Sequence, residues 1–143
     1  NNCKINSNMR YLLIIFTLFS FVLSESGDFG VVPMVSATWD KNIGFNYGAG
    51  LALGKWGEGI FTGIYTYYSY SKKGNNFSFG PYSGVGLAAF RFGITRLKLK
   101  NDIDKVYWGV ETSPTIIMGH LRFAILKDDK KPKFSYALGL GIF

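Results

Sequence analysis

The last ten residues of the chain, residues 134–143, read FSYALGLGIF. Large side chains occupy every second position, starting with Phe134, and Ser, Ala or Gly occupies the positions between them. Successive side chains of a strand point to opposite faces, so this alternation predicts a β-strand with one bulky face and one face of small residues. Such strands suit the confined interior of a small barrel. A glycine-rich β-sandwich is the alternative that composition leaves open.

The same kind of pattern continues upstream, where apolar runs alternate with charged or Gly/Asn-rich breaks. The runs predict strands at residues 30–39, 43–54, 59–71, 77–80, 85–99, 106–112, 115–126 and 134–143. In the fifth run the large residues change from odd to even positions near Ala88 and Ala89, which predicts a β-bulge there. We therefore expect eight strands, with six as the alternative because the fourth run is short and its end is not marked clearly.

The breaks between the runs form two groups that alternate along the chain. The first, third, fifth and seventh are polar and mostly long, at residues 40–42, 72–76, 100–105 and 127–133. The second, fourth and sixth are short and carry few charges, at residues 55–58, 81–84 and 113–114. Alternate connections of an up-and-down barrel emerge at the same end. The alternation of polar and short breaks therefore predicts polar outer loops at one end of the barrel and tight turns at the other.

Residues 9–24 have the pattern of a secretory signal peptide. An Arg precedes the apolar run at residues 11–23, and Ser24 supplies the small residue of a cleavage site. The run is shorter than the roughly 20 apolar residues that a membrane-spanning helix needs. We expect export and cleavage after Ser24, so that residues 1–24 are an upstream remnant plus signal peptide and residues 25–143 are the barrel domain.

These features together resemble the small outer-membrane β-barrel proteins of Gram-negative bacteria. The resemblance rests on the signal pattern, on the Gly/aromatic alternation from Gly30 onward and on the terminal strand that ends at Phe143. It implies an all-β, antiparallel, up-and-down transmembrane barrel in the outer membrane. It also implies outer-membrane lipid, lipopolysaccharide and the barrel-insertion machinery as partners, with Phe143 as an insertion signal.

Four polar side chains inside the apolar runs form the candidate site, a lumen ion-pair cluster of Arg91, Glu111, His120 and Arg122. Their apolar neighbours suit the lipid face, and an Arg on that face near the bilayer midplane costs on the order of 2–4 kcal/mol. We therefore expect these polar side chains to point inward. Glu111 should pair with Arg91, Arg122 or both, because an unpaired charge in a narrow lumen is costly. Such a cluster either holds the strands in register or lines a solute path.

Three tryptophans, Trp39, Trp56 and Trp108, lie near the ends of apolar runs. An interfacial aromatic belt of a membrane protein would place tryptophans there. The alternative is that they belong to the core of a soluble fold.

Several function classes find little support in the sequence. The formal net charge is +7, from 16 Lys and Arg against 9 Asp and Glu, but aromatic residues do not interleave with the basic ones as a nucleic-acid surface requires. No motif places a nucleophile beside the only histidine, His120, so we expect no enzyme. The glycine-rich stretches lack the features of phosphate-binding loops. No cofactor or metal site is predicted.

The sequence thus predicts an outer-membrane barrel with a structural or interaction role and a narrow, side-chain-filled lumen. A small porin-like channel for ions or hydrophobic solutes would use the same fold. The alternative from another class is a secreted or periplasmic β-protein, lipocalin-like or sandwich-like, that binds a ligand in its interior.

Overall fold

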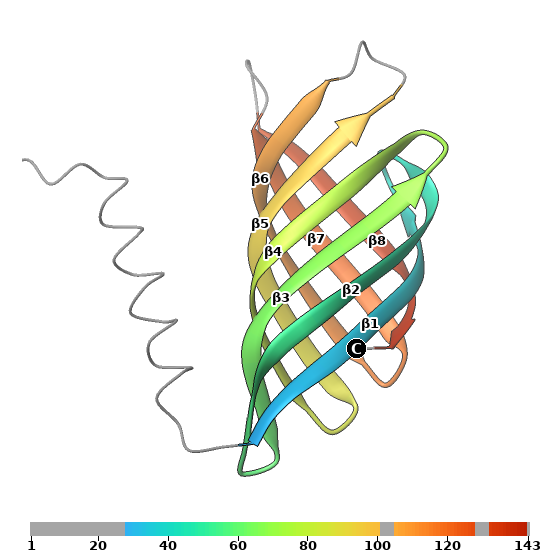
Figure 1. Cartoon of the computed structure of the whole chain (residues 1–143). Coiled ribbons are helices and arrows are strands. Elements are labelled where there is room, and N and C mark those ends of the chain that lie inside the picture. The colour runs from blue at the N-terminus through green and yellow to red at the C-terminus, as the bar shows by residue number, and fades with distance from the viewer. Residues whose placement is uncertain (1–27, 101–104, 128–131, 143) are drawn as a thin grey trace, which may run out of the picture.

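The chain folds into a closed antiparallel barrel of eight strands (Figure 1). The computed structural model describes residues 28–100, 105–127 and 132–142. The strands are β1 (Asp28–Asp40), β2 (Gly44–Gly57), β3 (Ile60–Ser71), β4 (Gly74–Val85), β5 (Ala88–Leu99), β6 (Val106–Ile116), β7 (Gly119–Lys127) and β8 (Lys133–Ile142). Each strand pairs with its neighbours in sequence, and β8 closes the barrel on β1. The predicted eight-stranded, up-and-down β-barrel is confirmed.

Parts of the sequence predictions lie outside the described residues. These are the signal peptide, the insertion signal at Phe143 and most of the loops at residues 100–105 and 127–133. In the described ranges, no helix has the length and apolar character needed to cross a membrane.

The pairing register fixes the tilt of the strands. A path of paired residues that starts at Asp28 crosses all eight strands and returns to β1 at Thr38, ten residues further along. The path runs through Trp56, Phe61, Gly84, Ala89, Thr115, His120 and Gly139. With about 3.3 Å per residue and about 4.7 Å between strands, this displacement gives a tilt of about 40°. The strands are 9 to 14 residues long.

The two ends of the barrel differ in their connections. At one end, here called the loop end, the connections lie at residues 41–43, 72–73, 100–105 and 128–132. At the other, the turn end, three two-residue turns lie at residues 58–59, 86–87 and 117–118. The predicted break at residues 72–76 is therefore wrong in length, because β4 already begins at Gly74. The breaks predicted at residues 81–84 and 113–114 are wrong as well, since both lie inside strands.

Both errors come from a proline that was expected to end a strand. Pro81 and Pro114 instead lie within β4 and β6. Pro81 pairs with Ile64 of β3 but has no partner in β5. Pro114 pairs with Phe90 of β5 but has no partner in β7. Pro33 likewise pairs with β2 and not with β8. A proline cannot donate to the ladder, so a strand tolerates it where pairing on one side is interrupted.

The β-bulge predicted at Ala88 and Ala89 is also wrong. The register between β4 and β5 is the same before and after the interruption at Pro81, so no extra residue is inserted. The chain instead reverses at Gly86, which has a φ of 55°. Outward residues occupy odd positions in β4, as far as Val85, and even positions in β5. The change from odd to even positions therefore comes from the turn between the two strands.

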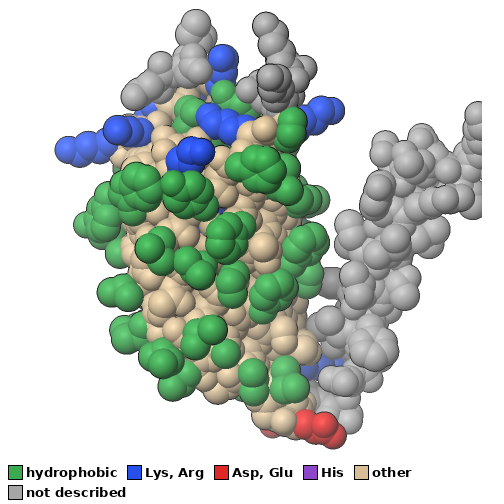
Figure 2. Space-filling model, turned by 180° about the vertical axis from the view of Figure 1, so that it is seen from behind, with side chains coloured by type: hydrophobic (Ala, Val, Ile, Leu, Met, Phe, Trp, Pro, Cys, Tyr) green, Lys and Arg blue, Asp and Glu red, His purple; other side chains and the backbone are tan. Residues whose placement is uncertain are grey.

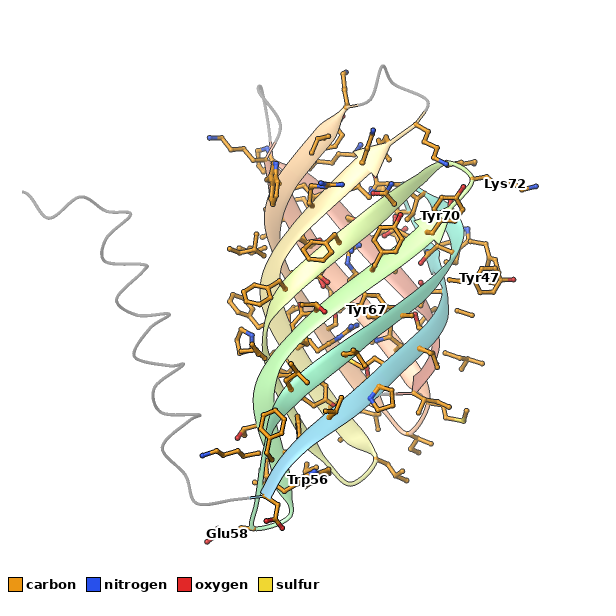
Figure 3. All side chains as sticks on the ribbon, in the orientation of Figure 1. Tyr47, Trp56, Glu58, Tyr67, Tyr70 and Lys72 are labelled. Carbon is orange, nitrogen blue, oxygen red and sulfur yellow. The ribbon has the colours of Figure 1, made fainter. Side chains whose placement is uncertain are left out.

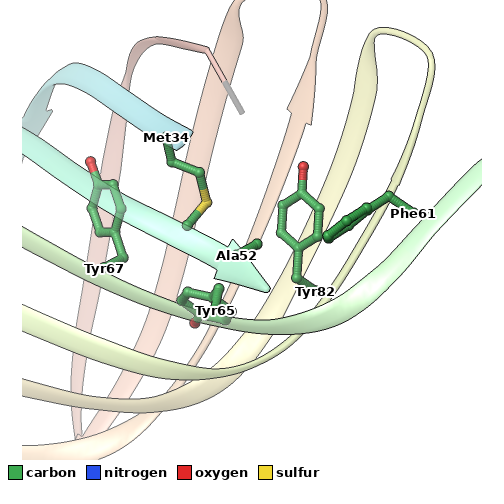
Figure 4. Close-up of a cluster of buried hydrophobic side chains, with 6 residues drawn as sticks. All are labelled: Met34, Ala52, Phe61, Tyr65, Tyr67 and Tyr82. Carbon is green, nitrogen blue, oxygen red and sulfur yellow. The ribbon is translucent and has the colours of Figure 1, made fainter. Parts of the chain in front are cut away.

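Side chains fill the interior in three layers. One apolar cluster lies on β1 to β4, mainly toward the turn end, and consists of Met34, Ala52, Phe61, Tyr65, Tyr67 and Tyr82 (Figure 4). A second cluster lies at the loop end and consists of Ile43, Leu97, Tyr107, Ala124 and Leu126. Buried charged residues lie between the two clusters: Arg91 contacts the ring of Tyr67 in the first, and Asp40 accepts the backbone N–H of Ile43 in the second.

Small inward residues let neighbouring strands approach closely, and Gly109 of β6 is one of them. A Cβ at this position would overlap the backbone carbonyl of Ile125 in β7. We expect Gly109→Ala to lower the free energy of unfolding by about 1–3 kcal/mol, because the overlap forces the strands apart. The matched control is Gly119→Ala, where the nearest atom to an added Cβ lies 3.5 Å away. Urea titration should show a lower midpoint for the first variant only, and equal midpoints would contradict the close approach.

Candidate functional site in the charged layer

Arg122 of β7 is the centre of the charged layer. Its Nε donates to Oε2 of Glu111 at 2.6 Å, and its Nη1 donates to Oδ2 of Asp40 at 2.8 Å. Its Nη2 donates to Oδ1 of Asn76 at 3.1 Å and to Oγ1 of Thr95 at 3.2 Å. The guanidinium therefore joins β7 to β1, β4, β5 and β6.

Both carboxylates that hold Arg122 have further partners. Oδ1 of Asp40 accepts the backbone N–H groups of Asn42 and Ile43, which ties the charged layer to the β1–β2 turn. Ser135 of β8 donates its hydroxyl to Oδ2 of Asp40 at 3.2 Å. Oε1 of Glu111 accepts the hydroxyl of Tyr65 at 3.3 Å. Buried charges are tolerated when they are paired and hydrogen-bonded in this way.

Arg91 of β5 forms a second group with His120 of β7. Its Nη2 lies 3.1 Å from Nε2 of His120, and Oγ1 of Thr115 lies 2.9 Å from Nδ1 of the same ring. An arginine only donates, so Nε2 accepts and a neutral ring carries its proton on Nδ1. The guanidinium also lies over the ring of Tyr67, 4.3 Å from its centroid, and near that of Tyr65 at 5.3 Å. Such cation–π contacts stabilise a desolvated cation.

The structure brings all four candidate residues together inside the barrel. Arg91, Glu111, His120 and Arg122 are each at most 5% exposed. Glu111 pairs directly with Arg122 at 2.6 Å, whereas Arg91 contacts His120 and the tyrosine rings. Together with Asp40, the layer contains two arginines and two carboxylates, so its charges balance.

Asp40 is the functional residue that sequence reasoning missed. The sequence pattern assigns it to the first break, yet it ends β1 and is 1% exposed. Its even position continues the inward face of Ser36 and Thr38, which are also buried. That shared parity is the signal that could have identified it.

The three tryptophans do not share one environment. Trp39 and Trp108 point outward near the loop end and are 51% and 55% exposed. Trp56 lies at the turn end, where its position in β2 shares the inward face of Ala52 (Figure 3). Its ring packs edge-on against buried Phe61, with centroids 5.1 Å apart. Trp56 therefore stands at the inner side of one mouth of the barrel, not in an outward belt.

The chemistry of the charged layer favours cross-linking of strands. Thr115 and His120 are in contact, but a general base would need an acceptor nitrogen facing the hydroxyl. Because Nε2 accepts from Arg91, the nitrogen that faces Thr115 carries the proton. Within residues 28–100, 105–127 and 132–142, no group of three His, Cys, Asp or Glu residues could hold a metal ion.

Comparison with known proteins adds no assignment. No protein-family model matches the chain, and neither a curated protein nor a solved structure matches it. The functional argument therefore rests on the fold and on the distribution of its side chains.

Removing Arg122 should destabilise the barrel more than removing one of its partners. Arg122→Met leaves Glu111 and Asp40 buried without their cation, for which we expect a loss of about 3–5 kcal/mol in the free energy of unfolding. Glu111→Gln should cost less, because Arg122 keeps Asp40. The double variant should recover part of the loss seen in Arg122→Met.

Urea titration of the folded protein checks this order. The control is Arg96→Met, which removes an arginine from the outer wall. If Arg122→Met unfolds at the same urea concentration as the parent, the charged layer does not stabilise the barrel.

Proposed function

We propose that the protein is an outer-membrane β-barrel with a structural or interaction role and a narrow, side-chain-filled lumen. The observation that carries this proposal is an inverted distribution of side chains. Among the described residues, 33 large hydrophobic side chains are exposed, while the buried set contains 16 polar or charged residues and 12 apolar ones. Soluble proteins rarely expose so much contiguous apolar surface. Membrane barrels have an apolar outer wall and a polar interior.

The arrangement of charge on the outside supports a membrane location. Hydrophobic side chains cover the wall, with basic residues at one end and acidic residues at the other (Figure 2). The described basic residues near the loop end are Lys41, Lys72, Lys73, Arg96, Lys98, Lys100, Lys105, Lys127 and Lys133. The described charged residues at the turn end are two acidic ones, Asp28 and Glu58, and one basic one, Lys55. The outward positions between these two groups carry no charge in the described strands, as an apolar band in lipid requires.

Aromatic side chains at the loop end also support this location. Trp39, Tyr47, Tyr70, Trp108 and Tyr136 are outward and exposed, each near the loop end of its strand. Figure 3 shows two of them, Tyr47 and Tyr70, below Lys72. Tyrosine and tryptophan are enriched where hydrocarbon meets headgroups. With a tilt of about 40°, strands of 9 to 14 residues are long enough to cross the hydrocarbon core.

The unequal ends favour one orientation. Bacterial outer-membrane barrels have short periplasmic turns and longer outer loops. The turn end has three two-residue turns, whereas connections at the loop end reach six residues. The loop end is therefore proposed to face the outside of the cell.

The packed interior argues against both alternative functions. A channel or an interior ligand site needs free space along the axis. Here Arg122 contacts residues of five other strands, and apolar clusters lie above and below it. A narrow, filled lumen fits this arrangement best.

Fractionation of expressing cells tests the proposed location. The protein should remain with the outer membrane after a carbonate wash, because its apolar wall is in lipid. It should also migrate differently on gels with and without heating, because the barrel resists detergent until heated. A protein that is released by carbonate would disprove the membrane proposal.

Protease treatment of intact cells tests the orientation. Trypsin should cut near Lys72 or Lys100 at the loop end and spare Lys55 at the turn end. Opened cells provide the control in which Lys55 becomes accessible. Cutting at Lys55 in intact cells would reverse the proposed orientation.

Planar lipid bilayers test the filled lumen. The purified barrel should insert without discrete conductance steps, because the charged layer and both apolar clusters block the axis. Steady steps from the parent protein would instead favour the channel function.

A further inference from the structure

One row of outward side chains on β4 to β7 combines aromatic and basic residues. Phe77 pairs with Arg96, Arg96 pairs with Trp108, and Trp108 pairs with Lys127. We call these four residues the basic–aromatic row. Side chains at directly paired positions have Cβ atoms about 4.5–5.5 Å apart, so each member of the row adjoins the next.

Arg96 differs from the other two arginines of the described chain. Arg91 and Arg122 are buried in the lumen, whereas Arg96 occupies an outward position of β5 beside Phe92 and Ile94 on the same face. Its Nε is buried and has no hydrogen-bond partner among the described residues. A guanidinium presents a fork of donors that matches the oxygens of a phosphate group.

The depth of Arg96 matches that of lipid headgroups. An outward arginine costs on the order of 2–4 kcal/mol at the bilayer midplane but only about 0–1 kcal/mol near an interface. Its neighbour Trp108 is 55% exposed and marks the interface at the loop end. Lys98 lies on the same face of β5, two residues closer to that end.

The two cations of the row flank Trp108, which creates a positive site beside an apolar ring. Arg96 adjoins the ring on the β5 side and Lys127 on the β7 side. One step toward the turn end, the next row consists of Phe79, Ile94, Val110 and Ile125, all exposed. A lipid whose headgroup binds the cations would lay its acyl chains over these four side chains.

The net charge of the loop end also favours an anionic ligand. Nine described basic residues lie there, and the only described acidic residue near it, Asp40, is already paired inside the lumen. The sequence adds four Asp and two Lys in residues 101–104 and 128–131, so basic residues still outnumber acidic ones.

We propose that the basic–aromatic row binds the phosphate group of an anionic membrane lipid, held between Arg96 and Lys127. This inference rests on the proposed membrane function and assigns it a specific lipid-binding site. The phosphate accepts hydrogen bonds from Arg96 and Lys127, and Phe77 and Trp108 exclude water from either side of Arg96.

Quenching by brominated lipids tests the site through Trp108. A variant with Trp39→Phe and Trp56→Phe leaves Trp108 as the only tryptophan. The barrel is placed in vesicles that mix phosphatidylglycerol and phosphatidylcholine, with bromine on the acyl chains of one lipid at a time. We expect phosphatidylglycerol to associate next to Trp108 roughly 25-fold more strongly, because each of the two cations of the row favours anionic lipid by about fivefold.

Two double variants test which residues cause the preference for phosphatidylglycerol. Arg96→Gln combined with Lys127→Gln should reduce the ratio of association constants to about one. Lys41→Gln combined with Lys72→Gln removes two charges from the same end but outside the row, and should leave the ratio near that of the parent. Unheated gel mobility confirms that each variant is folded.

The outcomes separate the two proposals. A ratio near one in the parent, a ratio that survives in the Arg96/Lys127 variant, or an equal loss in the Lys41/Lys72 variant would each overturn the lipid site while leaving the membrane barrel intact. Absence of quenching by either lipid would show that Trp108 does not face a bilayer, which refutes the proposed function and the lipid site with it.

Discussion

The guanidinium of Arg122 is the interaction on which the closed structure depends. It hydrogen-bonds to residues of β1, β4, β5, β6 and β8 from its own position on β7, so six of the eight strands meet at one side chain. A shift of any of these strands by one residue would turn its polar partner to the outer face. The charge would then remain buried without compensation, which is costly. The charged layer therefore selects one register for the whole barrel.

Much of the fold could be predicted from the sequence, because strand alternation is a local property. Residues 134–142 show the period of two directly, and they form β8 with the large side chains on one face and the small ones on the other. Pro81 and Pro114 were read as breaks, because their effect depends on whether the neighbouring strand pairs at that point. That pairing is a tertiary property, as is the position of the turn at Gly86. A single sequence pattern contains neither.

The members of the candidate site were easier to predict than their contacts. Arg91, Glu111 and Arg122 stood out because their apolar neighbours in the sequence mark the opposite face. Which carboxylate meets which arginine depends on the register around all eight strands, and that register also brings Asp40 to Arg122. A polar residue beside a turn looks like part of the turn, so Asp40 was missed. The outward face of Arg96 was equally hidden until the strand bounds were known.

The contrast between Arg122 and Arg96 explains how one barrel can combine stability with a surface role. Inside, the guanidinium is fully used: five acceptor side chains surround it, and none of its binding capacity remains for a ligand. On the outer wall, the Nε of Arg96 is buried without an acceptor among the described residues, and we propose that the remaining donors of this guanidinium bind a lipid phosphate. Because the lumen is occupied by the groups that close the barrel, the proposed lipid binding uses the outer wall near the loop end instead.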